Sequence, residues 1–300
     1  MKKKIIAILM TMFIMAGCSQ NKEREITDRE GTKVSIPNKI DKIISTAPSN
    51  TEVIVDLGLG DKLVAVDKYS SDVPGISKDL TKIDFSNPDA EAIIGLNPDI
   101  IIASGHNKTG SSEDPFKLVK EAGIPVVYIP SSESIKGIYE DIEFIANILN
   151  VENKGNELVN DMKSKIDEIA SIGKNITDKK SVYFEISPAP SLFTFGQGTF
   201  LNEMIEIIGA KNIFADEKGW ISPSAESVID KNPDIIFTNV DYTENPIKEI
   251  ETRDGFENIS AVKNNAVYQI DKNSSSRPSQ NIILALSQMD ESIYPDKYEK

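Results

Sequence analysis

The sequence contains one cysteine, one histidine and four arginines, and each scarcity excludes a class of site. Because Cys18 is the sole cysteine, the chain can form no internal disulfide, and the residues after it carry no thiol. His106 is the sole histidine, so zinc sites and catalytic sets built from several histidines and cysteines are excluded by count. Neither a Gly-x-x-x-x-Gly-Lys loop nor a Gly-x-Gly-x-x-Gly turn after the first strand is present. The composition therefore favours binding over catalysis.

The chain also has fewer basic residues than acidic ones. The chain has 33 lysines and arginines against 47 aspartates and glutamates, which gives a net charge of −14 at pH 7. Such an acidic protein repels nucleic acids and anionic lipid surfaces, so we expect no nucleic-acid partner. With 300 residues, 39% of them hydrophobic, the chain is long enough for one large domain or two moderate ones.

Long hydrophobic runs are absent except at the N-terminus. Lys2-Lys3-Lys4 precedes an apolar run over residues 5–16, which is too short to span a bilayer. The run ends in Met15-Ala16-Gly17-Cys18, which resembles the signal of a bacterial lipoprotein, in which the cysteine is lipidated. We therefore expect residues 1–17 to be a signal peptide and residues 18–25 a polar tether. Loss of the three lysines would take the net charge to −17. The alternative is a plain secretory signal with a chance cysteine.

Two passages, 135 positions apart, have nearly the same pattern. Residues 87–101 read NPDAEAIIGLNPDII, and residues 222–236 read SPSAESVIDKNPDII. Each predicts a short helix, capped by Asn87 or Ser222 with proline at its first position, followed by a buried strand. A glutamate, Glu91 or Glu226, would lie in the first turn near the positive end of the helix dipole. Two such units in register predict two related halves.

Strands and helices alternate on both sides of one long helix. A hairpin is predicted at residues 26–37, and further strands at residues 42–45, 63–66, 100–104, 125–129, 181–186 and 266–270. Helices are predicted at residues 49–57, 134–149, 198–208 and 278–289. This alternation predicts mainly parallel sheets covered by helices.

An apolar stripe from Leu158 to Ile169 predicts one helix over residues 151–173, about 33 Å long. The predicted fold is therefore α/β, with two Rossmann-like lobes, residues 26–150 and 174–300, joined by a single long interdomain helix. The alternative is that this helix packs wholly on one half.

Two lobes of this kind bind ligands in the crevice between them, beyond the carboxyl ends of the strands. Five aromatic residues fall in segments next to predicted strands or next to the doubled units: Tyr69, Phe85, Phe193, Phe195 and Trp220. Together they predict a flat, apolar-walled cleft.

The ordered set of motifs resembles the substrate-binding lipoproteins of ABC importers for cobalamin, ferric siderophores and haem. The resemblance covers roughly residues 26–298. It rests on Asp28-Arg29-Glu30-Gly31, Ala47-Pro48-Ser49-Asn50-Thr51-Glu52, the doubled Asn-Pro-Asp-Ile-Ile, Gly209-Ala210-Lys211-Asn212-Ile213-Phe214 and Arg277. It implies two α/β lobes bridged by one long helix, with only slight closure around the ligand.

The resemblance implies partners as well. In this family a glutamate on each lobe docks into arginine pockets on the two permease subunits, and Glu91 and Glu226 stand at the matching places. The partners implied are an ABC permease dimer with its ATPase subunits, a small-molecule metal chelate and the membrane, reached through the lipid on Cys18. We expect an extracytoplasmic monomer with no cofactor other than its bound chelate, and no enzymatic activity.

Within the family the chain looks most like the cobalamin binders. Tyr69, Phe85 and Trp220 stand where those proteins place cleft aromatics, although a tryptophan is usual at Phe85, and Asn273 replaces an aspartate. A haem binder would be expected to offer methionine and histidine ligands near Phe85 and Val240, and neither occurs there. The expected ligand is therefore a corrinoid, then a ferric siderophore, with haem last.

Charge argues against one class of siderophore. Ferric catecholates are anionic and need several arginines or lysines. Arg277 is the one credible cleft arginine, with Lys68 and Lys272 as further candidates, and Arg253 stands in a stretch that is predicted to be peripheral. The alternative for Arg277 is a salt bridge at the start of the last helix. Other hypotheses are a sensor lipoprotein without transport, and an extracytoplasmic enzyme in which His106 meets carboxylates in the cleft.

Overall fold

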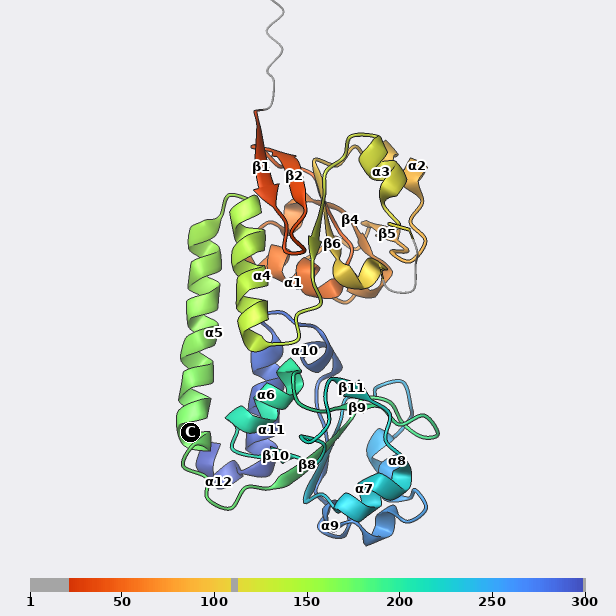
Figure 1. Cartoon of the computed structure of the whole chain (residues 1–300), viewed down its shortest axis with the longest axis vertical. Helices are drawn as coiled ribbons and strands as arrows, with labels where there is room; N and C mark the ends of the chain where they lie inside the picture. The colour runs from red at the N-terminus through yellow and green to blue at the C-terminus, as the bar shows by residue number, and fades with distance from the viewer. Residues whose placement is uncertain (1–21, 109–112, 299–300) are drawn as a thin grey trace, which may run out of the picture.

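The computed structural model describes residues 22–108 and 113–298. The predicted signal peptide (residues 1–17) and the first half of the predicted tether (residues 18–21, including Cys18) lie outside the described residues. Within the described ranges, no helix has both the length and the hydrophobicity that crossing a membrane requires. The chain forms two α/β lobes along its long axis, and helix α5 runs along one side of both (Figure 1). The predicted fold class is confirmed.

The N-terminal lobe contains a five-stranded parallel sheet in the order β5-β4-β3-β6-β7. Its strands are β3 (Ile43–Ser45), β4 (Leu63–Asp67), β5 (Thr81–Ile83), β6 (Ile100–Ser104) and β7 (Val126–Ile129). All residues of β6 are buried, as expected for a central strand with helices on both faces. The helices of this lobe are α1 (Pro48–Asp56), α2 (Ala90–Gly95), α3 (Lys117–Glu121) and α4 (Ile135–Ile148).

The C-terminal lobe contains a four-stranded parallel sheet in the order β10-β8-β12-β13. Its strands are β8 (Ser181–Glu185), β10 (Lys211–Asn212), β12 (Ile235–Thr238) and β13 (Val267–Gln269). A separate antiparallel pair joins β9 (Thr194–Phe195) to β11 (Trp220–Ile221). The helices of this lobe are α6 (Phe200–Ile207), α7 (Ala225–Lys231), α8 (Pro246–Glu251), α9 (Ser260–Lys263), α10 (Lys272–Ser276), α11 (Ile282–Ile293) and α12 (Pro295–Tyr298).

The connecting helix α5 (Glu152–Gly173) has 22 residues, and its bounds agree with the prediction to within one residue. It packs against α4 at one end and against α6, α11 and α12 further along, so the alternative of a helix confined to one half is wrong. Gly155 allows the close approach to α4, because an added Cβ would lie 2.3 Å from the Cβ of Ala146. Val159 and Met162 belong to a hydrophobic core that continues from one lobe into the other.

The doubled unit has the predicted helix-strand form, α2 followed by β6 and α7 followed by β12. The predicted caps are two residues too early. Asp89 accepts from the amide of Ala92 (3.0 Å), and Ser224 accepts from the amide of Ser227 (3.1 Å). Because these cap residues keep an extended backbone, the prolines lie before the helices and not in their first turns.

Two further boundaries differ from the prediction. The N-terminal hairpin consists of β1 (Glu23–Thr27) and β2 (Lys33–Pro37), so the first strand begins inside the predicted tether. Arg24 holds it there by donating from Nη2 to the carbonyl of Asn147 (2.8 Å), at the end of α4. The last long helix begins at Ile282 and not at residue 278. The preceding Ser279 and Gln280 donate to Glu52 and Asp56 of the N-terminal lobe.

Candidate functional site

A cleft of about 1180 Å³ lies between the two lobes. Its lining includes residues at or just beyond the carboxyl ends of the parallel strands: Ser104 at the end of β6, His106 after it, Ile186 after β8, Asn239 after β12 and Gln269 at the end of β13. This is the place at which open α/β sheets bind ligands. The predicted crevice is therefore present, with both lobes contributing to its walls.

Aromatic side chains of the N-terminal lobe form one wall of the cleft. The ring centroids of Tyr69 and Phe85 are 6.0 Å apart, and those of Phe85 and His106 are 6.4 Å apart. Tyr69 is 58% exposed although it lines the cleft. The turn that carries it is held by Asp67, whose Oδ1 accepts from the amide of Tyr69 (2.8 Å). Burial raises the pKa of Asp67, and its hydrogen bonds from Ser70 and Tyr69 offset only part of that rise.

The C-terminal lobe contributes a second aromatic wall. Trp220 stacks on Phe193 with 6.1 Å between ring centroids and 9° between ring planes, and it is 41% exposed. Both residues line the cleft. Phe195 is fully buried and meets Trp220 edge-on at 6.0 Å, so it supports the tryptophan from behind and does not line the cleft. The pairing of β9 with β11 places Trp220 directly opposite Phe195.

His106 lies in the cleft on a short turn that is anchored by its neighbour. Asn107 is buried, and its Oδ1 accepts from Thr46 Oγ1 (2.6 Å) and from the amide of Ser104 (2.8 Å). The imidazole of His106 meets the ring of Phe85 edge-on. Among the described residues, no carboxylate accepts a hydrogen bond from the imidazole of His106. The hydrogen-bonded pairing of His106 with a carboxylate, which the enzyme hypothesis requires, is therefore not observed among these residues.

Arg277 and Asn273 line the cleft, but both are engaged across it. Arg277 donates from Nη1 to Oε1 of Glu52 (2.8 Å) and from Nη2 to Oδ1 of Asp72 (2.8 Å). Asn273 donates to the other oxygen of Asp72 (2.7 Å). The sequence predicts ligand contacts for both donors and gives no role to either acceptor, because partners more than 200 residues apart leave no local signal. The alternative of a salt bridge near the last helix holds for Arg277, with partners in the other lobe.

Arg253 was expected to be peripheral, and the structure places it in the interior of the C-terminal lobe. It forms a buried bidentate pair with Glu185, with Nη1 to Oε2 at 2.7 Å and Nη2 to Oε1 at 3.0 Å. Burial raises the pKa of Glu185, and the hydrogen bonds from Arg253 offset part of the rise. Neither residue lines the cleft, so this pair organises the lobe and not the ligand site.

Glu91 and Glu226 are both exposed in the first turns of α2 and α7. The two helices lie at opposite ends of the molecule, on the side away from α5 (Figure 1). Each glutamate follows its N-cap by two residues, and each helix is followed by a left-handed asparagine, Asn97 or Asn232. The two units therefore present their carboxylates in equivalent local settings.

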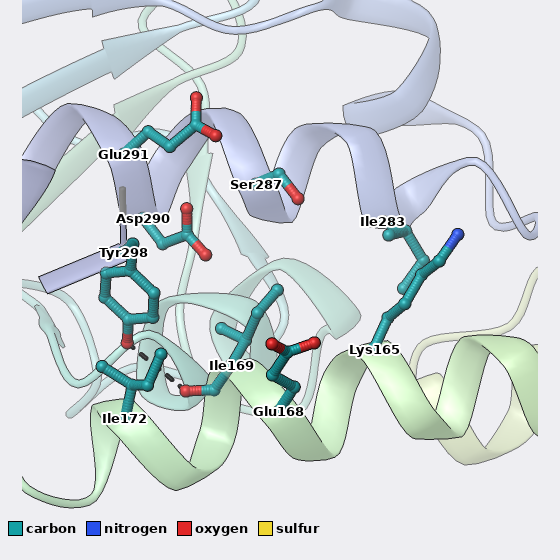
Figure 2. A pocket seen from close by; sticks show the side chains of 9 residues that line it. All are labelled: Lys165, Glu168, Ile169, Ile172, Ile283, Ser287, Asp290, Glu291 and Tyr298. Atoms are coloured by element: carbon teal, nitrogen blue, oxygen red, sulfur yellow. Dashed lines mark hydrogen bonds between the residues drawn. The ribbon is translucent and has the colours of Figure 1, made fainter. Parts of the chain in front are cut away.

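A second, smaller cavity of about 280 Å³ lies outside the cleft, between α5, α11 and α12. Figure 2 shows Asp290 of α11 facing α5, with Glu168 and Lys165 on the opposite helix. The hydroxyl of Tyr298 donates to the carbonyl of Ile169 (3.4 Å) and closes one end. Asp290 is only 3% exposed, and burial, helped by the nearby Glu291, raises its pKa to about 7.

Among the described residues, no cluster of three or more histidine, cysteine, aspartate or glutamate side chains could hold a metal ion.

Comparison with known proteins places the chain in a family. It is 34% identical to the uncharacterized ABC transporter substrate-binding lipoprotein YvrC of Bacillus subtilis, over 98% of this chain and 97% of that protein. It is 27% identical to a vitamin B12-binding protein of Vibrio campbellii, over 83% and 87% of the two chains.

Among solved structures, it resembles a possible iron-binding, periplasmic solute-binding protein of Staphylococcus epidermidis. That likeness has a TM-score of 0.76 and 34% identity, over 86% of this chain and all of the other. The family model described as periplasmic binding protein matches residues 43–274, which include both sheets and α5. With its two lobes and interlobe cleft, the chain belongs to the periplasmic binding protein family.

Proposed function

We propose that the protein is the extracytoplasmic receptor of an ABC importer and that its cargo is a metal chelate, a corrinoid in preference to a ferric siderophore. The single observation that carries this proposal is the pair of aromatic walls, Tyr69 and Phe85 from one lobe and Phe193 and Trp220 from the other, lining one cleft. Two walls of this kind suit a large, flat ligand that is held between ring faces and edges.

The size of the cleft supports a large ligand. Its volume of about 1180 Å³ exceeds the range of about 300–1,000 Å³ that is usual for small-molecule pockets. A bulky macrocycle or siderophore would fill this space, whereas a single amino acid or oxyanion would leave most of it to water. The similarity to a vitamin B12-binding protein over more than four-fifths of the chain favours the corrinoid.

Ligand binding can be tested through the tryptophan. Trp220 is the only tryptophan of the chain and lines the cleft, so titration with cyanocobalamin or ferrichrome should quench its fluorescence. Calorimetry should then show that Tyr69→Ala weakens binding by about tenfold or more, since a buried aromatic contact is worth roughly 1–3 kcal/mol. Tyr242→Ala is the matched control, because Tyr242 is 65% exposed and does not line the cleft. If neither chelate class binds, the proposal fails.

The same proposal gives Glu91 and Glu226 a role in docking. Two exposed carboxylates in equivalent first turns suit a permease dimer that offers one basic pocket to each lobe. The pairing would steer and register the complex, and the acidic net charge of −14 would add to the attraction of a basic surface. Lipidation of Cys18 would keep the receptor near its permease, and the similarity to a named lipoprotein supports that anchor.

Docking and binding can be separated by mutation. Glu91→Ala combined with Glu226→Ala should abolish uptake of the chelate into cells while the purified protein binds it unchanged. Glu121→Ala combined with Asp230→Ala removes two other exposed carboxylates, one from each lobe, and should leave uptake intact. Uptake that survives the first pair would contradict the docking role and would leave the sensor hypothesis open. Cys18→Ser should release the protein from the membrane fraction.

A further inference from the structure

A cluster of polar side chains connects the two lobes at one edge of the cleft. Arg277 contacts three residues of the N-terminal lobe: Glu52 through Nη1, Asp72 through Nη2, and the carbonyl of Tyr69, also through Nη2 (3.1 Å). The hydroxyl of Ser279 donates to the second oxygen of Glu52. We call these five residues, together with Asn273, the interlobe cluster. Every one of these contacts joins segments that are more than 200 residues apart.

Burial makes the cluster hard to open. The side chains of Glu52 and Arg277 are 4% and 12% exposed. A ligand carboxylate that took Arg277 away from Glu52 would leave a buried carboxylate without its cation, which is strongly unfavourable. Glu52 therefore holds the guanidinium against competition from the cleft.

Asp72 is the accessible partner of the same guanidinium. Its side chain is 51% exposed. Burial alone would raise the pKa of Asp72, but the hydrogen bonds from Arg277 and Asn273 outweigh it and hold the pKa below its usual value. Asp72 therefore remains a carboxylate at neutral pH and is paired with Nη2 of Arg277.

The other charged residues that line the cleft also disfavour an anionic ligand. Among the described lining residues, the lysines and arginines are Arg277 and Lys272. Lys272 donates to Asp241 (2.8 Å). Glu133 and Asp271 add two more carboxylates to the lining. Within the described part of the cleft, each lysine or arginine is thus already paired with a carboxylate, and carboxylates outnumber these cations.

We propose that Arg277 acts as a tie between the lobes and not as a ligand contact, and that the cleft selects chelates that carry no net negative charge. This inference rests on the proposed function, since it defines which metal chelates the receptor takes. Asp72 is the specificity-determining residue, because it occupies the arginine that an anionic chelate would need. Neutral and cationic corrinoids or hydroxamate chelates fit such a cleft, and anionic chelates do not.

The test compares related chelates that differ in net charge. One pair is cyanocobalamin and its monocarboxylate, in which one peripheral amide has been hydrolysed. The other pair is ferrioxamine B, which carries an ammonium group, and its N-succinyl derivative, which carries a carboxylate. We expect the wild-type protein to prefer the neutral or cationic member by about tenfold or more, measured by calorimetry. Asp72→Asn should reduce that preference by about tenfold, because it removes the negative charge that is paired with Nη2 of Arg277.

Glu133→Gln is the matched control. It removes the same charge from an exposed cleft residue that does not contact Arg277, and it should change the preference by less than about threefold. Thermal unfolding should confirm that both variants are folded, as their exposure predicts. Equal affinity for both members of a pair in the wild type, or equal effects of the two variants, would overturn the inference alone. Failure of all four chelates to bind would overturn the proposed function, and the inference with it.

Discussion

Replacement of Asp290 by asparagine should change the way in which the stability of the protein depends on pH. Burial raises the pKa of Asp290 to about 7, whereas an aspartate in an unfolded chain titrates near about 3.9. Between these values the folded protein holds a proton that the unfolded chain has released. The free energy of unfolding of the wild type therefore falls as the pH rises through this window, and the contribution is lost above pH 7.

The magnitude follows from the size of the window. One pKa unit corresponds to about 1.4 kcal/mol, so the two units from pH 5 to pH 7 limit the loss of unfolding free energy to about 3 kcal/mol. The carboxyl group borders a cavity that is also lined by Lys165, Glu168, Glu291 and Tyr298, and water or Lys165 can partly compensate the charge once it forms. We therefore expect an effect of about 1–3 kcal/mol.

Urea unfolding at pH 5 and pH 8 measures this effect. The difference in unfolding free energy between Asp290→Asn and the wild type should grow, in favour of the variant, by about 1–3 kcal/mol between the two pH values. Glu291→Gln removes an exposed carboxylate from the same helix, and its difference from the wild type should change by less than about 0.5 kcal/mol. A constant difference for Asp290→Asn would refute the argument that burial of this group controls the pH dependence.

Two further substitutions test the packing of the connecting helix and the buried ion pair of the C-terminal lobe. Gly155→Ala should destabilise the protein by roughly 1–3 kcal/mol in urea unfolding, because its Cβ would lie 2.3 Å from that of Ala146. Gly95→Ala, whose Cβ would meet nothing within 4 Å, is the control and should cost nothing. Arg253→Met should cost about 3–5 kcal/mol by leaving Glu185 buried and unpaired. The double variant with Glu185→Leu should regain much of that loss, and no recovery would contradict the buried-charge argument.

Much of the fold is readable from local pattern. The repeated NPDII passages predicted two related halves, and both prove to be a helix followed by a central parallel strand. The apolar stripe of α5 located the connecting helix, because one buried face at helical spacing is a property of neighbouring residues. Short elements with weak patterns were missed, including the three-residue β5 and the serine-rich α10 (KNSSS), whose composition disfavours helix.

The aromatic residues of the site were predictable only as a set. Tyr69, Phe85, Phe193 and Trp220 line the cleft, as the sequence indicated. Phe195 has the same character in the sequence as Phe193, two positions earlier. Strand alternation does not separate them, because residues two positions apart lie on the same face of a strand. Phe195 belongs to β9, pairs with Trp220 of β11 and is fully buried, whereas Phe193 lies before β9 and lines the cleft, so only the tertiary structure distinguishes them.

The sequence by itself determined the α/β class, the two halves, the long connecting helix and the candidate residues, because each of these depends on spacing along the chain. Only the tertiary structure decided what the charged residues do. Arg277 pairs with Glu52, which is 225 positions away in the sequence. Asp290 is shielded from water where α11 packs against α5 and α12. Ion pairing and desolvation depend on which groups come within a few ångströms in space, and a single sequence carries no record of such distances.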